Sequence, residues 1–269
     1  MKVKKCFFEA FASPYSLAEA VKTRQNNHMF GTVSEARGRQ SFTLTDNYDE
    51  AEYILRHGAQ NIADRMNKSL ENIRASAQMD RAVLEPYYYG SRVNVPRAII
   101  GHPKAMIRRV NIPLKTSAVR LIYDISANCN IKAEELLKCG IVVLELVYRL
   151  EAARTRVELD VCGYAAETNS GDAVTFINLK RGQEPLDILK VAYPLAHPSF
   201  FRRHNFKWME TVSGAEYPDS GYGRHLSKDR LQSILTAHNA GGKLLQYSDI
   251  QRAEYNWRQL AKELEITVN

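Results

Sequence analysis

The sequence has few cysteines and lacks any long apolar run. Its four cysteines lie far apart, and none forms the C-x-x-C pair of a zinc ribbon or a thioredoxin-like site. No stretch approaches the roughly 18 apolar residues of a membrane span, and the mean hydropathy is -0.38. Repeats of fixed period are also missing, which excludes solenoid and collagen-like chains. We therefore expect a folded cytoplasmic protein with reduced cysteines and no membrane partner.

Acidic residues are missing from one long segment, and this absence concentrates the positive charge. The 269 residues carry a net charge of +7, and the segment from Tyr87 to Arg120 holds seven Lys and Arg residues with no Asp or Glu. Three consecutive tyrosines open the segment. Cations attract phosphates regardless of base sequence, and tyrosine rings can stack on unpaired bases. The segment therefore predicts an interface for nucleic acid, either single-stranded or duplex.

A second segment, from Phe200 to Trp208, also combines basic with aromatic residues. For both segments a structural alternative stays open. Basic residues often form only a solvated face, and aromatic residues at helical spacing are typical of core packing. The residues expected to bind nucleic acid are Tyr87, Tyr88, Tyr89, Arg92, Arg97, Lys104, Arg108, Arg109, Arg202 and Arg203.

Helix and strand signals divide the chain into three parts. Residues 1–80 are predicted to be a helical N-terminal region, with Ser13 and Asp46 as N-caps and Gly58 as a helix stop. Residues 81–117 contain short β-type runs broken by glycine and proline, which predicts an irregular β/loop segment carrying the basic residues. Residues 118–269 are predicted to form an α/β core.

The core prediction depends on a strand, a helix and a hairpin in succession. An apolar run from Val119 to Tyr123 is followed by helical periodicity over about 132–154, with Gly140 expected at a close approach of backbones. Alternating residues over 156–164 and a second run over 173–179 then predict a hairpin. Strand, helix and strand form a βαβ unit, which indicates an open, mostly parallel sheet with flanking helices.

The loop after the first of these strands reads D-I-S-A-N and resembles the metal-ion-dependent adhesion site of von Willebrand factor A-like domains. The family pattern is D-x-S-x-S, and the resemblance implies that Asp124, Ser126 and Asn128 hold Mg²⁺ or Mn²⁺ within a von Willebrand A/Rossmann-like core. Asn128 replaces the second serine of that pattern. In the alternative interpretation, Asp124 and Ser126 only satisfy amides at the start of the following helix.

A wider resemblance links the chain to an uncharacterised family of bacteriophage-encoded proteins. It is carried by GHPKAM at 101–106, by the D-I-S loop, by Leu150–Ala152, by PLAHPSFFRR at 194–203 and by the segment from Thr45 to Gly58. The resemblance implies a viral origin and a place in the host cytoplasm, but it implies no activity.

Three functions compete at this point. We expect a non-enzymatic phage protein that binds nucleic acid through its basic, tyrosine-rich face. The alternative is a protein-binding or assembly module with a degenerate adhesion-type metal site, whose partner is another protein or a second copy of the chain. A third possibility is a metal-assisted phosphodiesterase, because scattered histidines could supply general bases. Those histidines are His102, His197, His204, His225 and His238.

Overall fold

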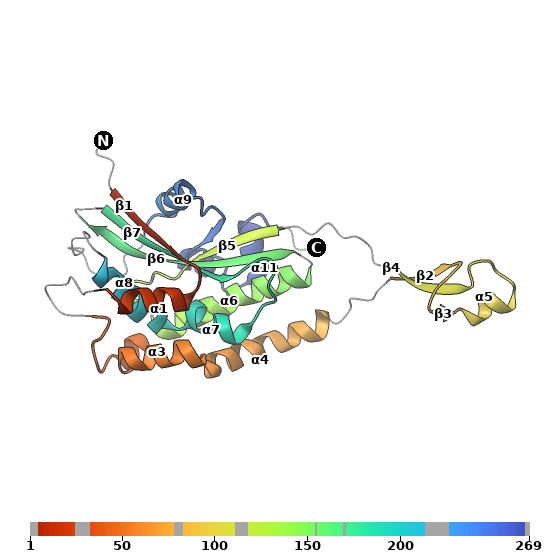
Figure 1. Cartoon of the computed structure of the whole chain (residues 1–269), viewed down its shortest axis with the longest axis horizontal. Helices are drawn as coiled ribbons and strands as arrows, with labels where there is room; N and C mark the ends of the chain where they lie inside the picture. Colours follow the sequence, from red (N-terminus) through yellow and green to blue (C-terminus); the bar gives the residue numbers. More distant parts are fainter. Residues whose placement is uncertain are drawn as a thin grey trace.

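Two separate sheets organise the protein. The computed structural model describes residues 5–24, 33–77, 83–110, 118–153, 155–168, 171–212 and 226–266. A five-stranded sheet and most of the helices form one body. A three-stranded sheet with one short helix forms a smaller unit, which lies apart from that body (Figure 1).

The five-stranded sheet is mixed but mostly parallel, which confirms the expected α/β class. Its strand order is β1-β7-β6-β5-β8. β5 pairs in parallel with β6 on one side and with β8 on the other, and β1 pairs in parallel with β7. β6 and β7 form the predicted antiparallel hairpin. The strands are β1 (Lys5–Phe11), β5 (Ala118–Asp124), β6 (Arg156–Thr168), β7 (Gly171–Lys180) and β8 (Lys243–Leu245).

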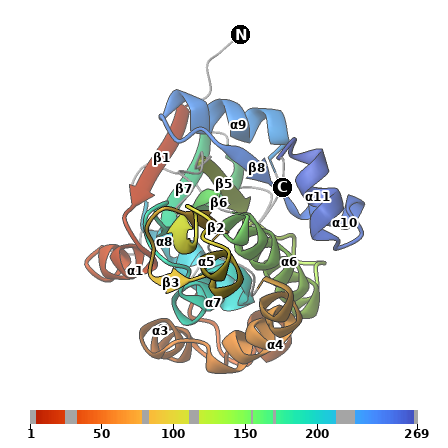
Figure 2. The ribbon, with the colours of Figure 1, turned by 90° about the vertical axis from the view of Figure 1, so that its right-hand side faces the viewer.

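Helices cover both faces of this sheet (Figure 2). α9 lies over one face, whereas α1, α6 and α7 lie over the other. α4 packs outside α6 and α7, and α3 packs outside α7. The helices of the body are α1 (Pro14–Lys22), α2 (Gln40–Thr43), α3 (Tyr48–His57), α4 (Gln60–Ala77), α6 (Ala133–Ala152), α7 (Ile188–Ala196), the π-helix η1 (Phe200–Asn205), α8 (Phe206–Thr211), α9 (Lys228–Ala237), α10 (Tyr247–Arg252) and α11 (Trp257–Glu263). No described helix is both long and apolar enough to cross a bilayer.

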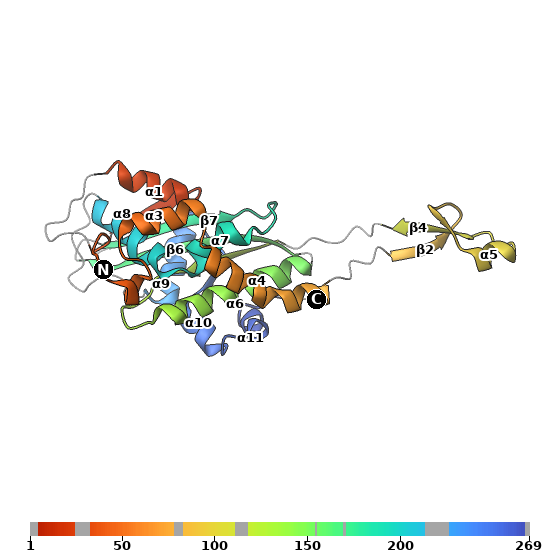
Figure 3. The ribbon, with the colours of Figure 1, turned by 90° about the horizontal axis from the view of Figure 1, so that it is seen from below.

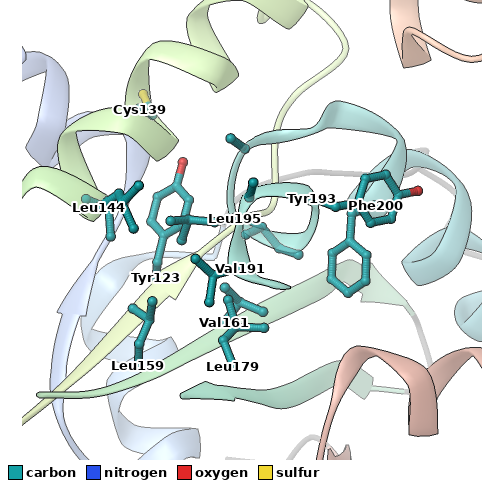
Figure 4. Close-up of a cluster of buried hydrophobic side chains, with 14 of the residues drawn as sticks. Tyr123, Cys139, Leu144, Leu159, Val161, Leu179, Val191, Tyr193, Leu195 and Phe200 are labelled. Atoms are coloured by element: carbon teal, nitrogen blue, oxygen red, sulfur yellow. The ribbon is translucent and has the colours of Figure 1, made fainter. Parts of the chain in front are cut away.

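The side chains of β5 alternate between two hydrophobic clusters because successive residues of a strand point to opposite faces. Leu121 and Tyr123 belong to the larger cluster, whereas Ile122 packs in the smaller one with Leu231 and Leu235 of α9. Figure 4 shows the larger cluster, in which residues of β5, β6 and β7 meet residues of α6 and α7. The predicted strands are therefore buried on both faces.

α6 and α7 approach each other closely at Gly140. A Cβ atom at this position would lie 2.4 Å from the Cβ of Ala196 and 2.9 Å from the carbonyl oxygen of Leu195. The expected close approach at Gly140 is therefore confirmed, and it allows α7 to pack tightly against α6.

The prediction of a helical region over residues 1–80 is wrong at its start. Lys5–Phe11 is a strand of the main sheet, whereas α1, α3 and α4 were expected. Asn47, not Asp46, caps α3, because its Oδ1 accepts the Glu50 amide at 2.8 Å. The N-cap at Ser13 and the positive φ of 87° at Gly58 agree with the prediction. The N-terminal elements and the predicted core thus form one body.

The smaller unit falls within the predicted basic segment 81–117. β4 (Met106–Val110) pairs antiparallel with β2 (Val83–Tyr87) on one side and with β3 (Arg92–Val93) on the other. α5 (Val95–Ile99) lies between β3 and β4 in the chain. Figures 1 and 3 both place α5 at the end of the molecule farthest from the main sheet.

Candidate nucleic-acid interface

The smaller unit presents two exposed tyrosines beside its cations. Tyr88 is 60% exposed and Tyr89 is 65% exposed. Both rings contact Tyr87 edge-on, with centroid distances of 5.4 and 5.0 Å. Stacking of bases needs an accessible ring, and the rings of Tyr88 and Tyr89 are both accessible.

Two cations lie against the tyrosine rings. The guanidinium carbon of Arg108 is 3.4 Å from the centre of the Tyr87 ring and 5.8 Å from that of Tyr89. The ammonium of Lys104 is 5.5 Å from the centre of the Tyr88 ring. Such contacts are cation–π interactions, and they hold aromatic and basic groups together on one surface.

The backbone of the unit explains how the tyrosines reach this surface. Gly90 crosses β4 so closely that a Cβ atom there would lie 2.1 Å from the carbonyl oxygen of Ile107. The Ser91 amide donates to that same carbonyl at 3.0 Å. The turn that carries Tyr88 and Tyr89 is thus fixed against the central strand.

The remaining cations of the unit have no ion-pair partner among the side chains that the structure describes. This holds for Arg92, Arg97 and Lys104, which stand on or beside β3, α5 and β4. The predicted binding residues Tyr87, Tyr88, Tyr89, Arg92, Arg97, Lys104 and Arg108 therefore come together in one unit. The side chain of Arg109 and the residue Lys115 lie outside the described part of the chain.

Arg120, the last cation of the predicted segment, belongs to the main sheet instead. Its Nε donates to Asp160 at 2.7 Å, and its guanidinium lies 3.6 Å from Glu158. Burial raises the pKa of Asp160, and the Arg120 guanidinium opposes that shift. Arg120 is thus neutralised within the sheet.

Arg202 and Arg203 are buried, so their predicted role in nucleic-acid binding is wrong. Arg202 is 1% exposed and donates to the carbonyl oxygens of Phe42 at 2.7 Å and Ile131 at 2.8 Å. Arg203 is fully buried and donates to Thr45 and to the Ser34 carbonyl. Guanidinium groups carry several donors and can satisfy buried carbonyls in this way. The structural alternative is correct here, and Phe200, His204 and Trp208 are likewise buried.

The Asp124 loop lies where the polar residues of two parallel strands meet. Asp124 ends β5, Gln246 follows β8, and the Gln246 amide nitrogen donates to Asp124 Oδ2 at 3.1 Å. Asp124 Oδ1 accepts the Ser126 amide at 2.9 Å, and Ser126 Oγ accepts the Tyr164 amide at 2.8 Å. Ligands of open α/β sheets bind at such strand ends.

The described oxygen atoms of this loop are poorly placed to ligate a divalent cation. Asp124 and Ser126 are 1% exposed and already accept hydrogen bonds from protein groups, whereas Asn128 is exposed. The nearby Asp249 carboxylate pairs with the Lys228 ammonium at 2.8 Å. Among the described residues, no cluster of three or more His, Cys, Asp or Glu could hold a metal. The described side chains therefore do not fit the Mg²⁺ or Mn²⁺ site that the resemblance implies.

The histidines do not form a catalytic group in the described part of the chain. Burial lowers the pKa of His197 and of His204 to about 4. His238 stacks on Phe8, His102 is exposed on the smaller unit, and His225 lies outside the described residues.

Sequence reasoning missed a buried contact between a hydroxyl and a histidine. Ser199 Oγ lies 2.8 Å from His197 Nδ1 and 2.9 Å from the hydroxyl of Tyr193. The H-P-S spacing could have indicated the contact. Ser199 is fully buried, so this pair offers no nucleophile to a substrate.

It also missed an apolar surface on the smaller unit. Val93, Val95, Ile99 and Ile100 are between 53% and 79% exposed. The signal was present as two adjacent isoleucines, preceded by a proline, within an acid-free segment.

An open cleft of about 930 Å³ lies in the body, at the opposite ends of β5 and β6 from Asp124. Arg120, Arg156 and Arg181 line it, but so do Glu158 and Glu184. Its charges are therefore close to balanced, and it offers less attraction to an anion than the smaller unit does.

Comparison with known proteins gives a family without a function. The family model described as "Domain of unknown function (DUF7192)" matches residues 3–267. No curated protein and no solved structure matches the chain. The resemblance to bacteriophage proteins therefore stays a prediction.

Proposed function

Because the chain belongs to the DUF7192 family, whose function is unknown, we propose its function from its own residues: it binds nucleic acid through the smaller unit, residues 83–110. The observation that carries this proposal is that Arg92, Arg97 and Lys104, which have no carboxylate partner among the described side chains, share one unit with the exposed Tyr88 and Tyr89. Nucleic acid matches both features of this surface, because its phosphates can contact the cations and its bases can stack on the tyrosine rings.

The electrostatic part of the proposal depends on Arg92, Arg97 and Lys104. Cations that pair with carboxylates of their own protein attract phosphates weakly, and Arg120 is such a paired cation. Cations without such partners can displace the counterions that surround nucleic acid, and this release supplies sequence-independent affinity. The expected affinity therefore falls steeply with salt.

The aromatic part depends on the arrangement around Tyr87. Arg108 covers the Tyr87 ring, so Tyr87 is not free to stack on a base and instead supports Tyr88 and Tyr89. Tyr88 and Tyr89 keep most of their surface exposed and remain available to bases or sugars. Aromatic stacking of this kind adds about 1–3 kcal/mol per base in single-stranded complexes.

We also propose that the body is a von Willebrand A-like domain. The succession β5, α6, β6 and β7, with β8 on the other side of β5, supports this assignment. In this proposal the Asp124 loop keeps the position of an adhesion-type site, while Gln246 and Ser126 satisfy its carboxylate. The body then acts as a scaffold for the smaller unit.

Fluorescence anisotropy with labelled single-stranded and duplex oligonucleotides tests the nucleic-acid proposal. The test variant is Arg92→Glu/Arg97→Glu/Lys104→Glu. The matched control is Lys68→Glu/Lys138→Glu/Lys262→Glu, which changes the net charge equally at exposed helical positions of the body.

We expect the test variant to lose at least tenfold in affinity and the control to change by less than threefold. The slope of log affinity against log salt should fall by about 0.9 for each phosphate contact removed. Equal losses in both variants, or no binding by the native protein at low salt, would overturn the proposal.

A further inference from the structure

The tip of the smaller unit is apolar, although cations surround it. Ile99 is 79% exposed and Ile100 is 75% exposed, which makes them the most exposed large apolar residues described. Val95, at 58%, lies one helical turn before Ile99 and shares its face of α5. Nucleic-acid binding by cations and tyrosines alone leaves this surface unexplained.

The backbone holds this tip in a fixed shape. The Asn94 side chain accepts the Arg97 amide at 3.4 Å, and its carbonyl accepts the Ala98 amide at 2.9 Å. After the helix, Gly101 takes a positive φ of 69°, and the His102 amide returns to the Arg97 carbonyl at 2.9 Å. The isoleucines therefore project from a turn that is closed on both sides.

The charge around the tip indicates what it meets. Arg97 lies within α5, Arg92 precedes it on β3, and Lys104 follows it before β4. In the part of the unit from Tyr87 to Val110 there is no acidic residue. A ligand must therefore offer negative charge at its surface and an apolar interior within reach of an isoleucine side chain.

We propose that Ile99 and Ile100 form a wedge that enters duplex DNA from the minor groove and partly unstacks one base step. This inference rests on the proposed nucleic-acid binding, and it specifies duplex DNA as the ligand. Minor-groove proteins insert isoleucine, leucine or proline side chains between base pairs, while adjacent cations contact the phosphates. The exposed Pro96 and the two isoleucines supply such side chains, and Arg92, Arg97 and Lys104 supply the cations.

The shape of the tip favours a duplex over a single strand. An unpaired base stacks best on an aromatic face, which Tyr88 and Tyr89 offer but an isoleucine does not. An aliphatic side chain that enters a base step costs some stacking energy, and this cost is offset because the bent duplex contacts more of the protein surface. The wedge should therefore kink the duplex by about 20–90°.

Energy transfer between dyes at the two ends of a duplex of about 30 base pairs tests the wedge. The variant is Ile99→Ser/Ile100→Ser, which changes only exposed side chains. Leu189→Ser on α7, 41% exposed, is the matched control. Anisotropy on the same duplex, on a single strand, and on phosphatidylcholine vesicles containing phosphatidylserine completes the set.

We expect the native protein and Leu189→Ser to shorten the end-to-end distance equally. The isoleucine variant should bind duplex at least tenfold more weakly and leave it straight. If the native protein binds duplex without bending it, or prefers single strands and is unaffected by the isoleucine variant, the wedge is overturned while nucleic-acid binding stands. Binding to the vesicles but to no nucleic acid would overturn both proposals.

Discussion

Arg203 and Thr45 are joined by two hydrogen bonds although 158 residues separate them in the chain. Arg203 Nε donates to Thr45 Oγ1 at 2.7 Å, and Nη2 donates to the Thr45 carbonyl at 2.9 Å. A further donor reaches the Ser34 carbonyl at 2.8 Å. This guanidinium fastens the segment before α3 to the π-helix η1.

Replacing Arg203 should therefore destabilise the fold without affecting nucleic-acid binding. Arg203→Met leaves several buried acceptors without a donor, and we expect a loss of about 3 kcal/mol in the free energy of unfolding. Urea denaturation measures the loss, with the exposed Arg65→Met as control. A stable Arg203→Met protein that no longer binds oligonucleotides would restore the original prediction for this residue.

Tyr88→Ala and Tyr89→Ala should each weaken the binding of single-stranded oligonucleotides. The loss of a stacked base contact corresponds to about 1–3 kcal/mol, or roughly fivefold to more than a hundredfold in affinity. Tyr53→Ala is the control because Tyr53 is 63% exposed on the body. Anisotropy titrations compare the three variants, and equal behaviour of all three would show that the tyrosines of the unit do not stack.

The protein should lose stability between pH 7 and pH 5 because of its buried histidines. Burial lowers the pKa of His197 and His204 to about 4, whereas an unfolded histidine titrates near 6.5. As the pH falls through this window, the unfolded state takes up protons first and is favoured. At pH 5 each histidine accounts for a loss of about 2 kcal/mol.

His197→Asn separates this contribution from other acid effects. Asparagine can still accept the Ser199 amide but does not titrate, so the difference in unfolding free energy between pH 7 and pH 5 should shrink. The exposed His57→Asn serves as control. An unchanged difference in His197→Asn would mean that this imidazole titrates normally in the folded protein.

Asp124→Ala should destabilise the protein by about 1–3 kcal/mol whether or not magnesium is present. The substitution removes the acceptor of the Ser126 amide and of the Gln246 side chain, both within the buried end of β5. Thermal unfolding with and without Mg²⁺ measures both effects. A melting temperature that Mg²⁺ raises in the native protein but not in Asp124→Ala would show that the loop binds the cation after all.

Local sequence signals predicted the centre of the main sheet well. Each of these elements has a pattern that is visible over a short stretch of sequence: the apolar run before Asp124, the helical periodicity around Gly140 and the alternation of the hairpin. β5, α6, β6 and β7 are therefore present as expected. The strand at Lys5–Phe11 was missed because its partner, β7, lies far along the chain. No local pattern distinguishes it from an apolar segment that precedes a helix.

The basic segments show a similar limit. Composition identified the cations from Arg92 to Arg108 together with their tyrosines, and the structure places them in one unit. It could not distinguish Arg202 from those residues, because the carbonyls that satisfy Arg202 belong to Phe42, Asn128 and Ile131. Whether an arginine faces solvent or the interior depends on such distant acceptors.

The pairing of β1 with β7 also constrains the order in which the protein folds. Lys5 lies opposite Gly171, so a growing polypeptide carries β1 without its partner until β7 has been synthesised. The hairpin of β6 and β7 has to exist before that strand can be added at its edge. The addition of β1 to the edge of the sheet is thus a late event, and it is slow because contacts between remote segments form slowly.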